Sequence, residues 1–305
     1  MPTKQPSIAV LMAACNGMDW IDKQLSTILD QQNIHVSIFI SVDPSSDCTE
    51  EWCRSFSLRH QNISLLPAAE TFSGAARNFF RLIRDVDFTG YDYIAFADQD
   101  DLWNRDKLDR AVTVLKTGEY AAYSSNVTAF WPNGKTLLLD KAQPQVDWDY
   151  LFEAGGPGCT YVLNMALAKH LKNTIIQSWI EIQDVSLHDW FCYAFARSQN
   201  YRWFIDPTPT MRYRQHAGNQ LGANVSVVSF MGRARQISTG WWFAQIKLIA
   251  KLVGKKDDPF VARWIKMGRM QLLWLALKSN KCRRRLRDRI AFSLICCWAA
   301  VSGKF

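Results

Sequence analysis

The chain has 305 residues, of which 48% are hydrophobic and 21% are charged. This length and composition allow one large domain with extensions or two small domains, and they exclude a fibrous or largely disordered protein. The charge is unevenly spread: residues 231–305 contain 17 Lys and Arg against 3 Asp and Glu, a net of +14, whereas residues 1–230 carry −6. An acidic body with a basic C-terminal segment predicts a polyanionic partner, either nucleic acid or an anionic membrane.

The eight cysteines show no spacing that is typical of a metal or redox motif. They form no C-x-x-C pair and no Cys/His zinc pattern, and several lie inside apolar runs. Residues 1–6 are polar and the first apolar run, residues 8–15, is short, so we expect no signal peptide. Reduced thiols in a cytosolic protein are therefore expected.

Residues 1–97 alternate between strand-like and helix-like segments. Apolar runs predict strands over 8–13, 36–42, 63–66 and 91–97. Apolar residues at helical spacing predict helices over 20–31, 49–58 and 73–84. Asp19 is placed to cap the first of these helices. Strands and helices alternating at this spacing indicate parallel strands joined by right-handed crossovers.

Polar side chains follow three of the predicted strands. Asn16, Asp43 and Asp98 each stand at or just after the end of an apolar run. Ligands of open α/β sheets bind at the carboxyl ends of the strands. These three residues therefore predict a nucleotide-binding crevice at that edge of the sheet.

The second half of the chain has a looser pattern. A hairpin is predicted from strands over 120–130 and 135–139, with a Pro-Asn-Gly turn between them. After a glycine-rich break at 155–158, we expect a strand over 159–163, a helix over 186–197 and short strands over 201–205 and 210–214. Beyond about residue 226 the chain is expected to be helical, and it is rich in Trp, Lys and Arg.

The acidic run Asp98-Gln99-Asp100-Asp101 ends the last strand of the first half. Carboxylates crowded at one strand-to-loop corner repel each other unless a cation lies between them. Mg²⁺ and Mn²⁺ prefer such oxygen ligands, usually together with substrate phosphates. The alternative is a solvated acidic turn that caps the following helix.

The stretch Tyr93 to Leu108 resembles the metal-binding segment of family-2 glycosyltransferases, and its Asp-Gln-Asp-Asp form is most similar to bacterial rhamnosyltransferases of surface-polysaccharide assembly. The resemblance covers about residues 6–224. The further segments that carry it, in the order of the family, are residues 8–17, 41–47, 73–79, 187–190 and 213–219.

This resemblance implies an α/β protein with the GT-A fold, which is Rossmann-like with a mostly parallel central sheet. Residues 1–225 would form the catalytic domain, with a nucleotide-sugar half over about 1–118 and an acceptor half over about 119–225. A helical, basic extension would follow over 226–305.

The resemblance also implies roles for single residues. Asp43 would hydrogen-bond the pyrimidine base; the usual Asp before it is Val42 here and the usual Gly after it is Pro44. The residues implied to bind the nucleotide sugar are Ala13, Asn16, Asp43, Arg77, Asp98, Arg214 and His216. Those implied to hold a divalent metal, Mg²⁺ or Mn²⁺, are Asp98, Asp100 and His216. Those implied to contact the acceptor are Gly158, Cys159, Thr160 and Trp190.

Asp189 is the candidate catalytic base. Transfer with inversion needs a group that takes the proton of the attacking hydroxyl, and such a group contributes about 10²–10⁴-fold to the rate. Asp189 precedes the aromatic-rich stretch Trp190 to Tyr193, which predicts a half-buried carboxylate with a raised pKa. The alternative is a first-turn Asp that interacts favourably with the helix dipole. His188, the second catalytic candidate, would orient the acceptor or the base, or pack.

Arg214 and His216 lie in a polar, glycine-containing segment that we expect to act as a flexible lid over the donor diphosphate, or as a basic surface loop. The Gly-Gly-Pro-Gly break at 155–158 matches neither G-x-G-x-x-G nor a P-loop, which argues against a dinucleotide or NTPase site. By resemblance this break lies near the acceptor pocket.

The C-terminal segment combines apolar, tryptophan-containing and basic stretches. Its last apolar run, Ile290 to Val301, is shorter than the roughly 17–25 residues needed to span a bilayer. Interfacial amphipathic helices on an anionic inner-membrane surface fit better, acting through residues 231–305. No nucleic-acid motif is present and the body is acidic, so we expect no nucleic-acid partner. A structural cap or a dimer face is the alternative.

Together these features predict an inverting, metal-dependent glycosyltransferase that works at the cytoplasmic face of the cytoplasmic membrane. The donor implied by the resemblance is dTDP-β-L-rhamnose, and the acceptor is a hydroxyl of lipopolysaccharide or another free or lipid-linked surface glycan. One alternative is a related transferase that uses UDP-galactose, UDP-glucose or UDP-N-acetylglucosamine. The others are a non-catalytic glycan- or nucleotide-binding protein and a nucleic-acid-binding protein.

Overall fold

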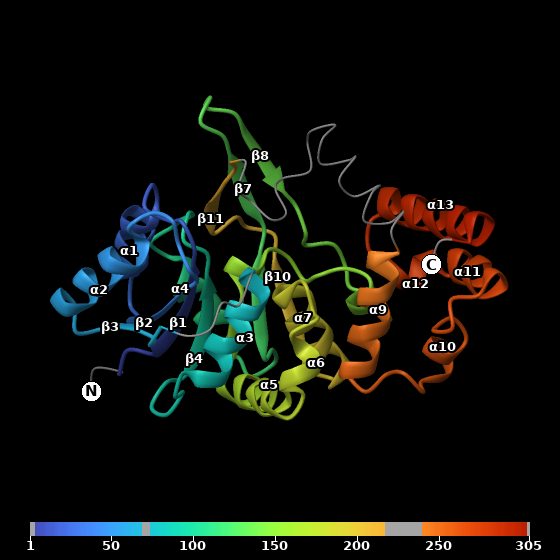
Figure 1. Cartoon of the computed structure of the whole chain (residues 1–305), viewed down its shortest axis with the longest axis horizontal. Coiled ribbons are helices and arrows are strands. Elements are labelled where there is room, and N and C mark those ends of the chain that lie inside the picture. Colours follow the sequence, from blue (N-terminus) through green and yellow to red (C-terminus); the bar gives the residue numbers. More distant parts are fainter. Residues whose placement is uncertain (1–3, 69–73, 217–239, 304–305) are drawn as a thin grey trace.

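The computed structural model describes residues 4–68, 74–216 and 240–303. Within these ranges the central sheet has the strand order β10-β6-β9-β4-β1-β2-β3. Figure 1 labels β1, β2, β3, β4 and β10 of this sheet. Its strands are β1 (Ser7–Ala14), β2 (His35–Val42), β3 (Ile63–Leu65), β4 (Tyr93–Ala97), β6 (Ala122–Ser125), β9 (Val162–Asn164) and β10 (Trp203–Asp206). β9 is antiparallel to β4 and β6, and the other paired strands run parallel. The predicted, mostly parallel sheet is confirmed.

β1 is an inner strand of the sheet, and all eight of its residues are buried. β1 lies between β2 and β4, with Ala14 opposite Val42 and Met12 opposite Ala97. All three strands therefore end at the same edge of the sheet. This edge brings together the polar residues that follow them in the sequence.

Helices cover both faces of the sheet. They are α1 (Ile21–Leu29), α2 (Thr49–Arg59), α3 (Ala75–Asp85), α4 (Lys107–Leu115), α5 (Met165–Gln177), α6 (Trp179–Ile182) and α7 (His188–Ser198). Successive residues of β1 point to opposite faces, so Leu11 joins the core beneath α3, α5 and α7, while Val10 joins the core beneath α1 and α4.

The start of α1 differs from the prediction. The helix begins at Ile21, and no side chain among the described residues caps it, so the predicted Asp19 cap is wrong. The backbone amides of Trp20 and Ile21 instead donate to the carbonyl of Gly17, both at 2.9 Å. A tight backbone turn therefore opens this helix.

A second sheet has the order β5-β11-β7-β8 within the described residues, and its strands are β5 (Leu102–Trp103), β7 (Val127–Phe130), β8 (Thr136–Leu139) and β11 (Met211–Arg214). The antiparallel β7–β8 hairpin is confirmed. The single predicted strand over 120–130 is wrong, because the chain changes sheet at Asn126. The Asn126 side-chain amide donates to Asp140 at 3.0 Å and to the Pro207 carbonyl at 2.9 Å.

Two 3₁₀ turns, η1 (Asp149–Leu151) and η2 (Gly158–Thr160), carry the chain across the acceptor half. The strand predicted over 159–163 therefore begins late, at Val162, because η2 occupies its first residues.

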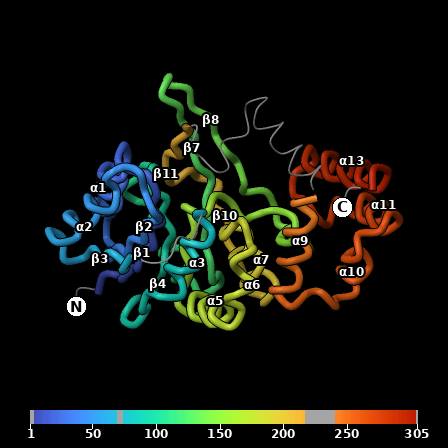
Figure 2. The backbone as a smooth tube through the Cα atoms, viewed as in Figure 1, coloured from blue at the N-terminus to red at the C-terminus, as the bar shows by residue number. Residues whose placement is uncertain are grey.

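The C-terminal extension is helical as predicted, with α9 (Trp241–Leu252), α10 (Pro259–Ala262), α11 (Arg269–Ala276), α12 (Ser279–Cys282) and α13 (Leu286–Ser302). It lies at the opposite end of the molecule from α2 (Figure 2). Phe243, Trp264 and Phe292 belong to the same hydrophobic core as α7. Among the described helices, none combines the length and apolar character needed to cross a bilayer.

Buried charges also join the extension to the body. Arg284 is fully buried, ion-pairs with Asp149 and Glu153 at 3.5 Å each, and donates to the Ala154 carbonyl at 2.7 Å. Asp149 is also bound by Arg197 of α7, at 3.2 Å. The division into a catalytic domain and an extension stays a prediction, and the two parts share one core and one ion-pair network.

Candidate functional site

The loops after β1 and β2 hold each other at the carboxyl edge of the sheet. Asn16 has a left-handed backbone (φ 49°), and its side-chain oxygen accepts the Ser46 amide at 2.7 Å. The Gly17 amide donates to the Thr49 hydroxyl at 2.8 Å, and the Met18 amide to an Asp47 carboxylate oxygen at 3.1 Å. The side-chain oxygen of Asn16, predicted to face the nucleotide, thus holds the neighbouring loop.

Gln99 joins the acidic run to the loop after β1. Its side-chain oxygen accepts the Cys15 amide at 2.8 Å, and its side-chain nitrogen donates to the Cys15 carbonyl at 2.7 Å. A β-carbon on Gly17 would lie 2.4 Å from the Gln99 side-chain oxygen, so any other residue at position 17 would displace this amide. Sequence reasoning missed Gln99, because an amide inside an acidic run is easily taken for a spacer.

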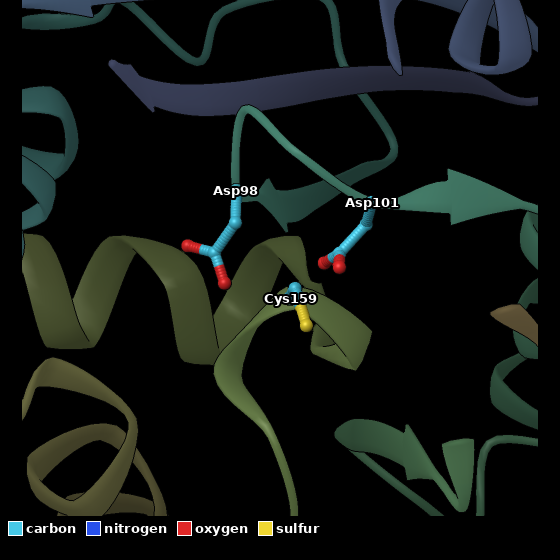
Figure 3. Close-up of side chains that lie close together, drawn as sticks. All are labelled: Asp98, Asp101 and Cys159. Carbon is cyan, nitrogen blue, oxygen red and sulfur yellow. The ribbon is translucent and has the colours of Figure 1, made fainter. Parts of the chain in front are cut away.

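Asp98 and Asp101 converge on Cys159 (Figure 3). One candidate ligand atom from each side chain lies within 4.8 Å of the others. Burial, and then the negative charges of Asp100 and Asp189, raise the pKa of Asp98 to about 7. Carboxylates this crowded are the setting in which a divalent cation binds well.

The end of β11 crosses the acidic run. His216 Nε2 lies 2.6 Å from an Asp100 carboxylate oxygen, and the imidazole stacks on Trp20 with ring centroids 4.2 Å apart. Arg214 Nε donates to the Asp100 carbonyl at 2.7 Å, and the Arg214 amide donates to Asp101 at 3.1 Å. Asp101 therefore holds the end of β11 in position.

Lys107, the first residue of α4, lies close enough to the acidic run to interact electrostatically with Asp101. It is fully buried, with Nζ 3.5 Å from the centroid of the Trp103 ring and no hydrogen bond within the described residues. Burial lowers the pKa of Lys107 to about 7, although the Cys159 thiol and Asp101 oppose the shift. Sequence reasoning missed Lys107 as well, because a lysine at a helix start is ordinarily solvated.

Asp189 stands in the first turn of α7. One of its carboxylate oxygens accepts the Trp190 amide at 2.7 Å. Burial raises the pKa of Asp189 to about 6, although the Trp190 hydrogen bond and Lys141 oppose the shift, and this agrees with the expected direction. Its charge in turn raises the pKa of Asp98, so the two carboxylates lie close enough to interact electrostatically.

His188 has the surroundings of a packed side chain. Its imidazole stacks on Phe79 with ring centroids 3.9 Å apart and meets Phe96 edge-on at 5.7 Å. Burial lowers the pKa of His188 to about 3, so the ring is neutral near pH 7. A β-carbon on Gly158 would lie 2.6 Å from His188 Nε2. A catalytic role for His188 stays a prediction.

The residues predicted to bind the acceptor fall into two groups. Gly158 lies against both Asp189 and His188. Cys159, Thr160 and Trp190 are at most 4% exposed. Their burial leaves little side-chain surface for an acceptor, so they form the floor beneath the site.

The remaining predicted donor residues lie around the same edge. Ala13 is buried near the end of β1, and Asp43 is buried after β2, where its amide donates to the Ala14 carbonyl at 2.8 Å. Arg77 Nε donates to the Gln183 carbonyl at 2.7 Å, which ties α3 to the segment before α7. The calls for Ser73 and for residues 217–219 fall outside the described residues.

A cleft of about 870 Å³ lies elsewhere, and Tyr120, Arg197 and Trp203 are among its lining residues. Tyr120 and Trp203 stand at the amino ends of β6 and β10. This cleft is therefore at the edge of the sheet opposite the carboxylates, and it is not the candidate donor site.

A cluster of carboxylates and the buried carboxyl of Asp189, at the carboxyl edge of such a sheet, fit a glycosyltransferase. The profile of Glycosyl transferase family 2 matches residues 9–156. The chain is 45% identical over 285 residues to dTDP-rhamnosyl transferase RfbG of Shigella flexneri, which covers 93% of this chain and 98% of that relative. The chain belongs to glycosyltransferase family 2.

Solved structures show the same fold. S. aureus TarS 1–349 in complex with UDP-GlcNAc matches with a TM-score of 0.56 at 12% identity, covering 98% of this chain and 93% of that one. The mannosyltransferase PcManGT from Pyrobaculum calidifontis, in complex with GDP-Man and Mn²⁺, matches with a TM-score of 0.55 at 15% identity, covering 100% and 89%. At these identities the likeness concerns the fold alone, and the predicted GT-A fold is confirmed.

Proposed function

We propose that the enzyme transfers L-rhamnose from dTDP-β-L-rhamnose to a hydroxyl of lipopolysaccharide or another surface glycan, with inversion. The donor rests on the 45% identity, over nearly the whole chain, to a protein named a dTDP-rhamnosyl transferase. The chemistry rests on one observation: Asp189 is a buried carboxyl with a raised pKa, and it lies close enough to the acidic run after β4 for its charge to raise the pKa of Asp98.

In the proposed reaction Asp189 is the base. The acceptor oxygen forms a bond to C1 of rhamnose while the bond from C1 to the phosphate oxygen breaks. The acceptor proton passes to the Asp189 carboxylate, and dTDP leaves. The Trp190 amide fixes one oxygen of this carboxylate. In this proposal the other oxygen accepts the proton of the acceptor hydroxyl.

Asp98, Asp100 and His216 would hold a divalent metal. The 2.6 Å approach of His216 to Asp100, and the raised pKa of Asp98 to which the charge of Asp100 contributes, support this, because they show that the three ligand-type groups lie close together. Two carboxylates and an imidazole suit Mn²⁺, and the carboxylates suit Mg²⁺. The bound metal would neutralise charge on the diphosphate. Asp43 would meet the thymine base, and Arg214 the donor beside the metal.

We further propose that the enzyme is peripheral on the inner face of the cytoplasmic membrane, held there by residues 231–305. The net charge of +14 in this segment supports the location. Catalysis would belong to residues 1–225, with the donor bound by about 1–118 and the acceptor by about 119–225.

The test is a panel of dTDP-rhamnose, UDP-galactose, UDP-glucose and UDP-N-acetylglucosamine, each with Mn²⁺, Mg²⁺ or EDTA. We expect dTDP-rhamnose with metal to raise the unfolding temperature most, since ligand binding stabilises the folded state. We also expect slow, metal-dependent release of dTDP. Stronger stabilisation by a UDP-sugar would replace the donor assignment. Stabilisation without sugar release or transfer, even with a surface-glycan acceptor, would indicate a binding protein.

A further inference from the structure

Helix α13 is apolar on both sides, yet one side faces solvent. Phe292, Cys296 and Ala299 are buried against the extension. The residues on the opposite side are Leu286 (71% exposed), Ile290 (55%), Leu294 (66%), Trp298 (42%) and Val301 (82%). Their spacing of three or four residues puts them in one stripe along the helix. A helix that is apolar all round is normally covered on all sides.

Helix α11 lies beside α13 and has a similar stripe. The Ser293 hydroxyl of α13 donates to the Ala276 carbonyl of α11 at 2.8 Å. Met270, Leu273 and Leu277, on or just after α11, are 73%, 39% and 80% exposed. We call these two stripes the α11–α13 face.

This face concentrates the exposed apolar surface of the protein. Of the thirteen large hydrophobic side chains exposed in the described part of the chain, eight belong to it. Scattered exposed apolar residues are normal, whereas a cluster of this kind marks an interaction surface.

Most of the charges next to this face are basic, and Asp288 in the first turn of α13 is an acidic exception. Arg269 precedes Met270, Lys278 follows Leu277, and Arg287 follows Leu286. The Arg287 side chain is 79% exposed, and its Nε also pairs with Asp288 at 3.3 Å. Basic groups at the margin of an apolar surface complement anionic headgroups.

Other basic residues of the extension are already used within the protein. Arg284 is buried with Asp149 and Glu153, Arg285 pairs with Asp140 at 3.0 Å, and Lys281 pairs with Asp147 at 3.1 Å. The number of basic residues available to a membrane is therefore smaller than the net charge of the extension implies. The apolar stripes would provide the remaining contribution to membrane binding.

We propose that the α11–α13 face inserts into the headgroup region of an anionic bilayer, with its apolar side chains immersed and its basic residues among the phosphates. This rests on the proposed membrane location and names the surface that produces it. α13 has 17 residues. At 1.5 Å per residue it is about 25 Å long, which suits a helix that lies in the plane of the interface.

A second copy of the chain fits this face less well. In a two-fold dimer the same patch meets itself, so the basic residues at its margin would approach their own copies. Like charges brought together oppose association, whereas an anionic leaflet attracts them. The exposed Trp298 also suits the membrane interface, where tryptophan is enriched.

The test compares three full-length proteins in flotation with vesicles: wild type, Ile290→Glu/Leu294→Glu, and the control Leu58→Glu/Ile180→Glu. The control residues are equally apolar and are 85% and 86% exposed, on α2 and α6. With phosphatidylglycerol-containing vesicles we expect wild type and control to float and the face variant to bind at least tenfold less. Vesicles of phosphatidylcholine alone should bind wild type more weakly.

Three outcomes would overturn the proposal. The first is equal flotation of wild type and face variant. The second is complete release of wild type by high salt, which would assign binding to charge alone. The third is a wild-type dimer in light scattering that the face variant converts to a monomer without a change in flotation. Release of dTDP from dTDP-rhamnose, measured on the same samples, tests the proposed reaction separately and should be equal in all three proteins.

Discussion

Replacing Asp189 with asparagine tests the site in two independent ways. Asparagine keeps the size of the side chain and an oxygen that can accept the Trp190 amide, but it cannot take a proton from an acceptor hydroxyl. We expect transfer to fall by about 10²–10⁴-fold, the usual contribution of a general base. Donor binding should be retained, because the donor is assigned to other residues.

The same substitution should stabilise the free protein at neutral pH. Burial raises the pKa of Asp189 from 3.8 to about 6, so the folded state holds this proton more tightly than the unfolded state. Ionisation of Asp189 therefore costs nothing below pH 3.8 and its full penalty above about pH 6. A shift of about two units corresponds to about 3 kcal/mol. At about 2 °C per kcal/mol, the Asn variant should unfold up to about 6 °C higher at pH 8.

Thermal unfolding of wild type and Asp189→Asn at pH 4, 6 and 8, without donor or metal, measures this effect. The difference should be largest at pH 8 and should disappear at pH 4. A difference that is the same at every pH would show that ionisation of Asp189 is not its source. Transfer at near-normal rates by the variant would refute the assignment of the base. The wild-type rate should also fall as pH drops below about 6, because the base becomes protonated.

Three further substitutions test the surroundings of the site. Gln99→Met removes both hydrogen bonds to the loop after β1, each contributing about 0.5–1.5 kcal/mol. The KM for the donor should therefore rise about tenfold. Gln32→Met, at an exposed residue, is the control. Gly158→Ala places a β-carbon 2.6 Å from a buried imidazole, and transfer should fall with a lower unfolding temperature. Arg284→Met leaves two buried carboxylates without this partner and should cost about 3–5 kcal/mol, against less than about 1 kcal/mol for the exposed Lys281→Met.

Kinetics and thermal or denaturant unfolding measure these effects. An unchanged donor KM in Gln99→Met would mean that the loop after β1 keeps its position without the two Gln99 hydrogen bonds. Full transfer activity in Gly158→Ala would show that the base tolerates a displaced neighbour. Equal stability of the two extension variants would contradict a structural role for the buried ion pairs.

The sequence predicted the donor edge because its signals are local. Apolar runs set β1, β2 and β4, and the polar residue after each run stands at the carboxyl end of a parallel strand. Asp189 was proposed as the base from the resemblance of residues 187–190 to the corresponding segment of the family, and its raised pKa was predicted from its aromatic neighbours. Each of these signals spans only a few neighbouring residues. They could therefore be read without knowing any contact between residues far apart in the sequence.

The supporting residues could not be predicted, because their partners are far away in the sequence. Gln99 bonds to Cys15 across 84 positions, and Asp101 receives the amide of Arg214 across 113. The exchange of sheets at Asn126 has the same origin, since its side chain bonds to Pro207 across 81 positions. From the sequence, Arg284 was counted among the membrane-facing charges of residues 231–305, whereas in the fold its side chain is buried.

That buried arginine has a consequence for how enzymes of this kind can be recombined. Asp149 receives Arg284 from the extension and Arg197 from α7, the helix whose first turn carries Asp189. A chimera that borrows the extension of a relative, in order to move the enzyme to another surface, would break this network unless both sides were exchanged together. The extension therefore cannot be exchanged by itself, because its buried arginine depends on residues of the body that also contact α7.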